Sequence, residues 1–160
     1  MTKLQSLRAD WIAIAVGTGA LALIMGALGY QYLGAMPPCN MCHWQRWPHI
    51  AAAIIGILGG GFLPRRHAYW VAGAAILLVL SSGLLGAWQA GFQWGIFPGP
   101  TTCSAARYVL GSNAPPPPSC SLLEAVFLGQ TLAFWNAVCS FLLAGIGGLL
   151  LWRTSHDPQA

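Results

Sequence analysis

The stretch WIAIAVGTGALALIMGALGYQYL, residues 11–33, contains no charged residue and is long enough to cross a membrane. Further apolar runs follow at about 47–63, 68–88 and 131–152. Three of these runs exceed the roughly 20 residues that cross a hydrocarbon core of about 30 Å, and the run at 47–63 reaches that length only if its helix begins earlier. Backbone groups cannot stay unpaired in lipid, so each run should be helical. The sequence therefore predicts an all-α membrane protein, a four-transmembrane-helix bundle.

The composition supports this class and excludes others. Apolar residues make up 56% of the chain and charged residues 6%, whereas about a quarter of an ordinary soluble domain is charged. The net charge of +4 is not arranged as a basic stripe with interleaved aromatic residues, so nucleic acid is not an expected partner. There is no internal repeat, and we expect one integral membrane domain over residues 1–160.

The first apolar run follows Lys3 and Arg8, as the core of a cleaved signal peptide would. It is longer than the usual core of roughly 7 to 15 residues, which favours a first spanning helix. Most basic residues fall on one side of the predicted bundle: Lys3, Arg8, Arg65, Arg66 and Arg153. The positive-inside rule then predicts that both termini are cytoplasmic and that two loops, at about 34–42 and 89–130, lie outside a bacterial cytoplasmic (inner) membrane.

The cysteines gather on the predicted outer side. Cys39 and Cys42 lie in the first outer loop, and Cys103 and Cys120 lie in the second. In a bacterium this side is the periplasm, where disulfides persist. Cys139 falls inside the fourth apolar run and is interpreted as a small packing residue.

Cys39 and Cys42 have the C-x-x-C spacing of a pair that cycles between dithiol and disulfide. A second helix starting near Cys42 and ending at about 63 would be long enough to span, would place Pro48 in its first turn, and would put Cys42 at its positive end. Arg46 would then lie one turn away on the same face and help to lower the pKa of the Cys42 thiol. The alternative for Arg46 is an interfacial arginine that only reaches toward the headgroups.

Cys103 and Cys120 allow two interpretations. A purely structural bridge between them would stabilise the fold by about 3 kcal/mol, and a second redox pair would form a relay with the first. The sequence shows no dinucleotide, phosphate-loop or flavin fingerprint, so the final electron acceptor should dissolve in the membrane, and a quinone fits.

Two further features of the second outer loop bear on its shape. The four prolines at 115–118 would form a stiff polyproline rod, or only a linker. After Cys120, a capping box and an apolar face predict a short interfacial helix that continues to Gly129. The alternative is a simple extension of the fourth helix.

A rival motif occupies the same positions, because residues 39–43 also spell C-x-x-C-H, the attachment signature of c-type haem. The motif lies against the membrane with few residues to wrap a porphyrin, and this interpretation gives no task to Cys103 and Cys120. The remaining histidines have no metal-ligand spacing, so no metal site is expected. A structural membrane protein with stapled loops is the third hypothesis.

Taken together, these motifs resemble the DsbB family, membrane oxidases that regenerate the thiol oxidase DsbA. The resemblance covers nearly the whole chain and rests on Pro38-Cys39-x-x-Cys42-x-x-Gln45-Arg46, Phe97-Pro98-Gly99-Pro100-Thr101-Thr102-Cys103, Pro118-Ser119-Cys120 and Phe127-Leu128-Gly129. The second loop is shorter between its cysteines than in the best-known members. A vitamin K epoxide reductase-like enzyme is a chemically related alternative, but its redox C-x-x-C is expected late in the bundle.

The resemblance implies a role for each cysteine. Cys103 would be the residue attacked by a periplasmic DsbA-like partner, with Cys120 as its loop mate. Cys39 would exchange with Cys120, and Cys42 would be the thiolate next to the quinone, either ubiquinone or menaquinone.

The resemblance also implies how the quinone is bound. Arg46 would stabilise the charge that develops on a quinone oxygen. The family can have a histidine at the outer end of the third helix, and none stands there in this chain. Gln89 is the nearest polar candidate for that position.

Overall fold

The computed structural model describes residues 3–35, 38–100, 120 and 126–156. It is helical apart from one short hairpin. The elements in chain order are α1 (Lys3–Tyr32), α2 (Asn40–Ile54), a π-helical turn (Ile55–Gly59), α3 (Gly60–Phe62), a 3-10 turn (Arg65–His67), α4 (Ala68–Gln93), β1 (Val126–Phe127), β2 (Gln130–Thr131) and α5 (Leu132–His156).

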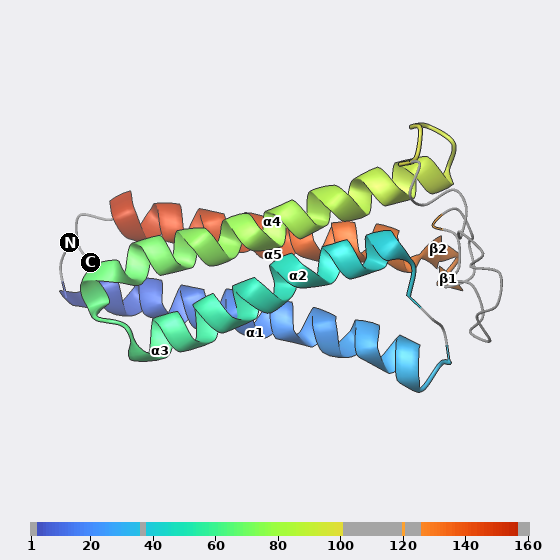
Figure 1. Ribbon diagram of the computed structural model, residues 1–160. Coiled ribbons are helices and arrows are strands. Elements are labelled where there is room, and N and C mark those ends of the chain that lie inside the picture. The colour runs from blue at the N-terminus through green and yellow to red at the C-terminus, as the bar shows by residue number, and fades with distance from the viewer. Residues whose placement is uncertain (1–2, 36–37, 101–119, 121–125, 157–160) are drawn as a thin grey trace.

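The long helices run side by side along a common axis (Figure 1). The start of α1, the start of α4 and the end of α5 lie at one end of the bundle, and the end of α1, the start of α2 and the hairpin β1–β2 lie at the other. α4 packs along α5 and also contacts α1 and α2. This arrangement brings residues 39–42 and residue 120 to the same end.

Three helical segments of the described chain are long and apolar enough to cross a membrane: Arg8–Tyr32, Arg65–Gln93 and Leu132–His156. α2 is shorter, with 15 residues, and its helical path continues through the π-helical turn and α3 to Phe62. The fourth span, marginal by length in the sequence, stays a prediction.

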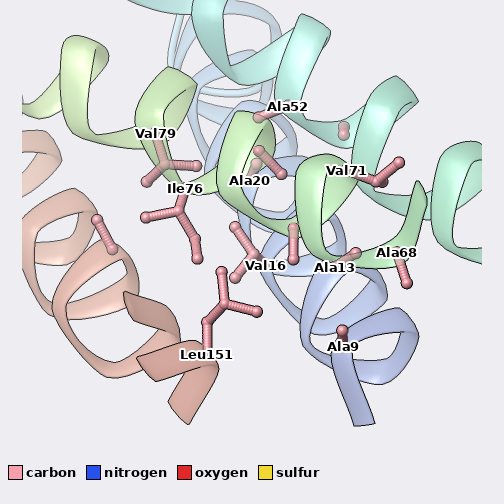
Figure 2. Packing of buried hydrophobic residues seen from close by; sticks show 14 residues of the cluster. Ala9, Ala13, Val16, Ala20, Ala52, Ala68, Val71, Ile76, Val79 and Leu151 are labelled. Carbon is pink, nitrogen blue, oxygen red and sulfur yellow. The ribbon is translucent and has the colours of Figure 1, made fainter. Parts of the chain in front are cut away.

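Small residues fill the end of the bundle that lies away from the cysteines. Ala9, Ala13 and Ala20 of α1 pack with Ala52 of α2 and with the buried face of α4 (Figure 2). Large apolar side chains such as Trp70, which is 76% exposed, point outward instead. Lipid tails are as apolar as a leucine side chain, so helices in a membrane associate through close packing of small residues. The sorting of small residues inward and large ones outward is therefore the pattern of a membrane bundle.

The π-helical turn is the point of closest approach between α1 and the second apolar run. A Cβ atom added to Gly56 would lie 2.5 Å from the carbonyl oxygen of Ala13 and 2.8 Å from the Cα of Gly17. No side chain fits between two backbones at that separation. Both Gly17 and Gly56 therefore have to be glycine.

The second helix begins earlier than the expected start near Cys42. Cys39 is the N-cap residue, with φ −75° and ψ 168°, and α2 begins at Asn40. Pro48 consequently lies in the interior of α2 and not in its first turn. The expectation for Pro48 was wrong because the helix begins earlier than predicted. The thiol of Cys39 caps it, and cysteine is not among the usual N-cap residues.

The interfacial helix expected to run from Cys120 to Gly129 is not formed over its described part. Val126 pairs with Thr131 and Phe127 with Gln130 in an antiparallel hairpin. Leu128 and Gly129 have φ values of 50° and 77°, and two consecutive positive φ angles belong to a tight hairpin turn. Residues 121–125 lie outside the described residues. The alternative extension of the fourth helix is also wrong, since α5 begins at Leu132.

We expect Gly56→Ala to lower the free energy of unfolding by about 1–3 kcal/mol, because the new methyl group overpacks the α1 contact. Gly73→Ala is the matched control, since a Cβ at Gly73 meets nothing within 4 Å. Thermal unfolding in detergent, followed by circular dichroism, measures both. A Gly56→Ala protein as stable as the control would contradict the close approach.

Candidate active site

Cys39 and Cys42 form the centre of the site at the start of α2. Both are free thiols. The sulfur of Cys39 accepts a hydrogen bond from the backbone N–H of Cys42, with an N–S distance of 3.2 Å. Cys39 is buried, and Cys42 is partly buried. The C-x-x-C motif thus places one sulfur as the helix cap and the other in the first helical turn.

The two thiols differ in acidity. The pKa of Cys42 is lowered to about 6, mainly by a hydrogen bond with Cys39 and also by the N–H of Gln89 and the charge of Arg46, while burial acts in the opposite direction. The pKa of Cys39 is raised by the same hydrogen bond and by burial. The negative charge of the pair therefore belongs to Cys42, because Cys39 keeps its proton and donates a hydrogen bond to the Cys42 sulfur.

Gln89 of α4 reaches both sulfurs. Its Nε2 lies 3.4 Å from the sulfur of Cys39 and 3.8 Å from that of Cys42. Its Oε1 accepts a hydrogen bond from Nε2 of Gln45, at 2.5 Å. Gln89 is 2% exposed. Gln89 also lines the cavity beside the thiols, and its expected contact with a quinone stays a prediction.

Arg46 lies one turn after Cys42 on α2, as the spacing predicts. Its Nη1 donates to Oε1 of Gln31 at 2.6 Å, and its Nη2 lies 3.5 Å from the carbonyl oxygen of Ala27. Among the described residues Asp10 is the only acidic one, and it pairs with Arg65. No carboxylate of the described chain neutralises Arg46, so its charge remains available to an anion.

Cys120 joins the same end of the bundle. Cys39, Met41 and Cys120 form one buried cluster, against which Cys42 and Phe92 pack. Cys120 is in a disulfide, and its carbonyl oxygen accepts a hydrogen bond from Nε2 of Gln93 at 3.1 Å. Cys103 lies outside the described residues. The described thiol pair and the second-loop cysteine are therefore packed together.

A cavity of about 520 Å³ opens beside Cys39 and Cys42. Cys42, Arg46 and Gln31 line it together with apolar residues of α1 and α5. A largely apolar cavity with a few convergent polar groups is the usual form of a small-molecule site. Cys139, interpreted as a packing residue, also lines it.

A group of polar residues that the sequence analysis did not assign lies behind the thiols. Nδ2 of Asn136 donates to Oε1 of Gln45 at 2.8 Å, and Nε2 of His49 lies 2.8 Å from Oδ1 of Asn136. Ser82 and Ser140, each 0% exposed, complete the group. Polar residues inside apolar runs are costly in lipid and mark functional sites, and that signal was present in the sequence.

Comparison with known proteins points to a single family. The family described as disulfide bond formation protein DsbB matches residues 9–150. Proteins named disulfide bond formation protein B are similar to this chain: that of Paracidovorax citrulli is 26% identical, over 90% of this chain and 87% of its own length, and that of Aromatoleum aromaticum is 29% identical, over 84% and 90%.

The protein of that name from Albidiferax ferrireducens is 30% identical, over 77% of this chain and 76% of its own length. No solved structure matches the chain. The family match spans most of the sequence and includes the thiol pair, Arg46 and the apolar helices described above. The chain therefore belongs to the DsbB family of multi-pass membrane proteins, and it is a disulfide oxidoreductase that takes part in disulfide bond formation.

Proposed function

We propose that the protein re-oxidises a periplasmic DsbA-like thiol oxidase and passes the electrons to a membrane quinone. The observation that carries the proposal is the environment of Cys42. Its thiol has a lowered pKa, it lies beside Arg46, whose charge no carboxylate of the described residues neutralises, and both residues line a largely apolar cavity. A thiolate held at such a cavity can give electrons to a carrier that is soluble in lipid.

The cysteines would act in two exchanges. A thiol of the DsbA-like partner attacks the disulfide that contains Cys120, whose second cysteine we assign as Cys103. The partner leaves with its own disulfide, and the loop cysteines keep two electrons and two protons. Their dithiol then reduces a Cys39–Cys42 disulfide through a bond between Cys120 and Cys39. The burial of Cys39 and Cys120 in one cluster supports this second exchange.

The residues that line the cavity fit a quinone headgroup. The cavity volume of about 520 Å³ lies within the range of small-molecule sites, roughly 300–1,000 Å³. Arg46 and Gln31 offer polar contacts for a ring oxygen, and the apolar walls suit a hydrocarbon ring. A bound quinone would accept two electrons and two protons from the Cys39–Cys42 dithiol, which becomes a disulfide. Arg46 would stabilise negative charge on a ring oxygen in a site of low dielectric constant.

The orientation in the membrane is part of the proposal. The turn with Arg65 and Arg66 lies at the opposite end of the bundle from Cys39. With the basic turn in the cytoplasm, both termini are cytoplasmic and the cysteines face the periplasm. This orientation gives a soluble periplasmic partner access to the disulfide of Cys120.

We expect Cys42→Ser to abolish quinone reduction, and Arg46→Met to lower kcat by roughly 100-fold, because it removes a cation beside the developing charge. Arg66→Met is the matched control and should keep full activity, because Arg66 lies in the turn Arg65–His67 at the opposite end of the bundle. Purified protein is mixed anaerobically with a reduced DsbA-like protein and a soluble quinone, and quinone absorbance is followed. Quinone reduction by Cys42→Ser, or a covalent haem band in the spectrum of the purified protein, would overturn the proposal.

The acidity of Cys42 gives a separate prediction. Alkylation of reduced protein by iodoacetamide requires the thiolate, so the rate at Cys42 should rise with pH and reach half its maximum near pH 6. An unperturbed thiol titrates at about 8.5. Cys39→Ala should move the midpoint upward, because the hydrogen bond from Cys39 is the largest cause of the lowered pKa.

The measurement is the modified fraction of the Cys42 peptide by mass spectrometry across a pH series. Cys139→Ala serves as the control and should leave the midpoint in place. A Cys39→Ala protein with an unchanged midpoint would show that the acidity arises elsewhere.

A further inference from the structure

The amide side chains of Asn136, Gln45 and Gln89 form a continuous row from the interior of the bundle to the thiols; Gln45 and Gln89 are buried, and Asn136 is partly buried. Nδ2 of Asn136 in α5 donates to Oε1 of Gln45 in α2. Nε2 of Gln45 donates to Oε1 of Gln89 in α4, whose Nε2 is directed to the sulfurs of Cys39 and Cys42. In each amide the oxygen therefore faces the interior of the bundle, and the N–H faces the next amide or, for Gln89, the sulfurs.

A row of amides can in principle run in either direction, because an amide has a donor at one end and an acceptor at the other. A neighbour that can only accept removes this freedom. The backbone carbonyl oxygen of Ser82 lies 3.2 Å from Nδ2 of Asn136 and has no proton to donate. A reversed Asn136 would place two oxygens against each other, so Ser82 fixes the direction of the first amide.

The oxygen of Asn136 is held from its other side. Nε2 of His49 lies 2.8 Å away, and Oγ of Ser140 donates to the same oxygen at 3.3 Å. Since the amide oxygen can only accept, the proton of His49 resides on Nε2. Nδ1 of His49 is buried and has no partner among the described residues, which suits a neutral ring. Donors therefore surround the oxygen of Asn136, and an acceptor faces its nitrogen.

We infer that Asn136 and Gln45 are positioning residues that hold the amide of Gln89 with its N–H directed at the sulfurs of Cys39 and Cys42. The carbonyl of Ser82 sets the direction, and the row transmits it across three helices. Gln89 has no other support of this kind among its described hydrogen bonds. Without the row, the side chain of Gln89 could turn its oxygen to the thiols.

The direction matters because the two ends of Gln89 have opposite effects on a thiol. An N–H donor stabilises a thiolate, whereas a carbonyl oxygen repels a thiolate and accepts a hydrogen bond from the neutral thiol. The thiolate is the reactive form in disulfide exchange and in electron donation. A chain of hydrogen bonds in a medium of low dielectric constant also strengthens its members. The row therefore keeps the reduced pair in its reactive state.

The inference rests on the proposed function only in taking Cys42 as the reactive thiolate. Its test uses reduced protein with neither quinone nor partner. A protein that failed to reduce quinone could still show a Cys42 midpoint that depends on Asn136 and Gln89. A protein that reduced quinone could lack that dependence. The two proposals can thus fail separately.

The experiment compares Asn136→Leu, Gln89→Leu and the double variant by the pH dependence of Cys42 alkylation. Each single variant should raise the midpoint by about one pH unit, since a hydrogen bond to a charged group is lost. The double variant should match Gln89→Leu alone, because Asn136 acts only through Gln89. The charged or titratable groups of the described chain that act on Cys42 are Cys39 and Arg46, and all variants retain them.

Thr154→Val is the matched control, because Thr154 is a buried polar residue of α5 that bonds only to its own helix, at the carbonyl of Leu150. It should leave the midpoint in place. If Asn136→Leu does not fold, Gln45→Met carries the same expectation. An unchanged midpoint in these variants, or shifts that add in the double variant, would overturn the inference.

Discussion

A polar atom inside a hydrocarbon layer has to find its hydrogen-bond partner within the protein, and the half of this bundle that contains the thiol pair is built around that constraint. Gln45, Gln89 and Asn136 come from three helices and satisfy one another. Helix positions are thereby fixed by directional bonds as well as by packing. The thiol pair is attached to this framework through Gln89, so the acidity of Cys42 depends on how three helices are assembled.

Much of the architecture follows from local features of the sequence. The apolar runs predict the long helices because their lengths match the hydrocarbon core. Arg46 lies beside Cys42 because four residues make about one helical turn. The two cysteines of the C-x-x-C motif are three residues apart, which is close to one helical turn, so their sulfurs also lie near each other. The family resemblance rested on these same motifs, and the family match over residues 9–150 confirms it.

Other features depend on contacts that no local pattern encodes. Gln45 and Asn136 are 91 residues apart in sequence, and Gln45 and Gln89 are 44 apart. Their pairing becomes visible only when the helices are assembled. The hairpin found over the described part of the expected interfacial helix depends on the positive φ of Leu128, and leucine rarely adopts a positive φ. Trp135 donates to the carbonyl oxygen of Phe127 and braces that turn from α5.

The alanine-rich packing at the opposite end has a consequence for movement during turnover. An alanine side chain has no rotamers to exchange, so Ala9, Ala13 and Ala20 add no side-chain rearrangement to a core that they share with larger residues such as Val16 and Leu151. At the cysteine end, Met41 and Phe92 can change rotamer around the reacting sulfurs. Thiol exchange displaces atoms by only a few bond lengths. Such displacements will be absorbed near the cysteines, and the alanine-rich end will keep the helices in register.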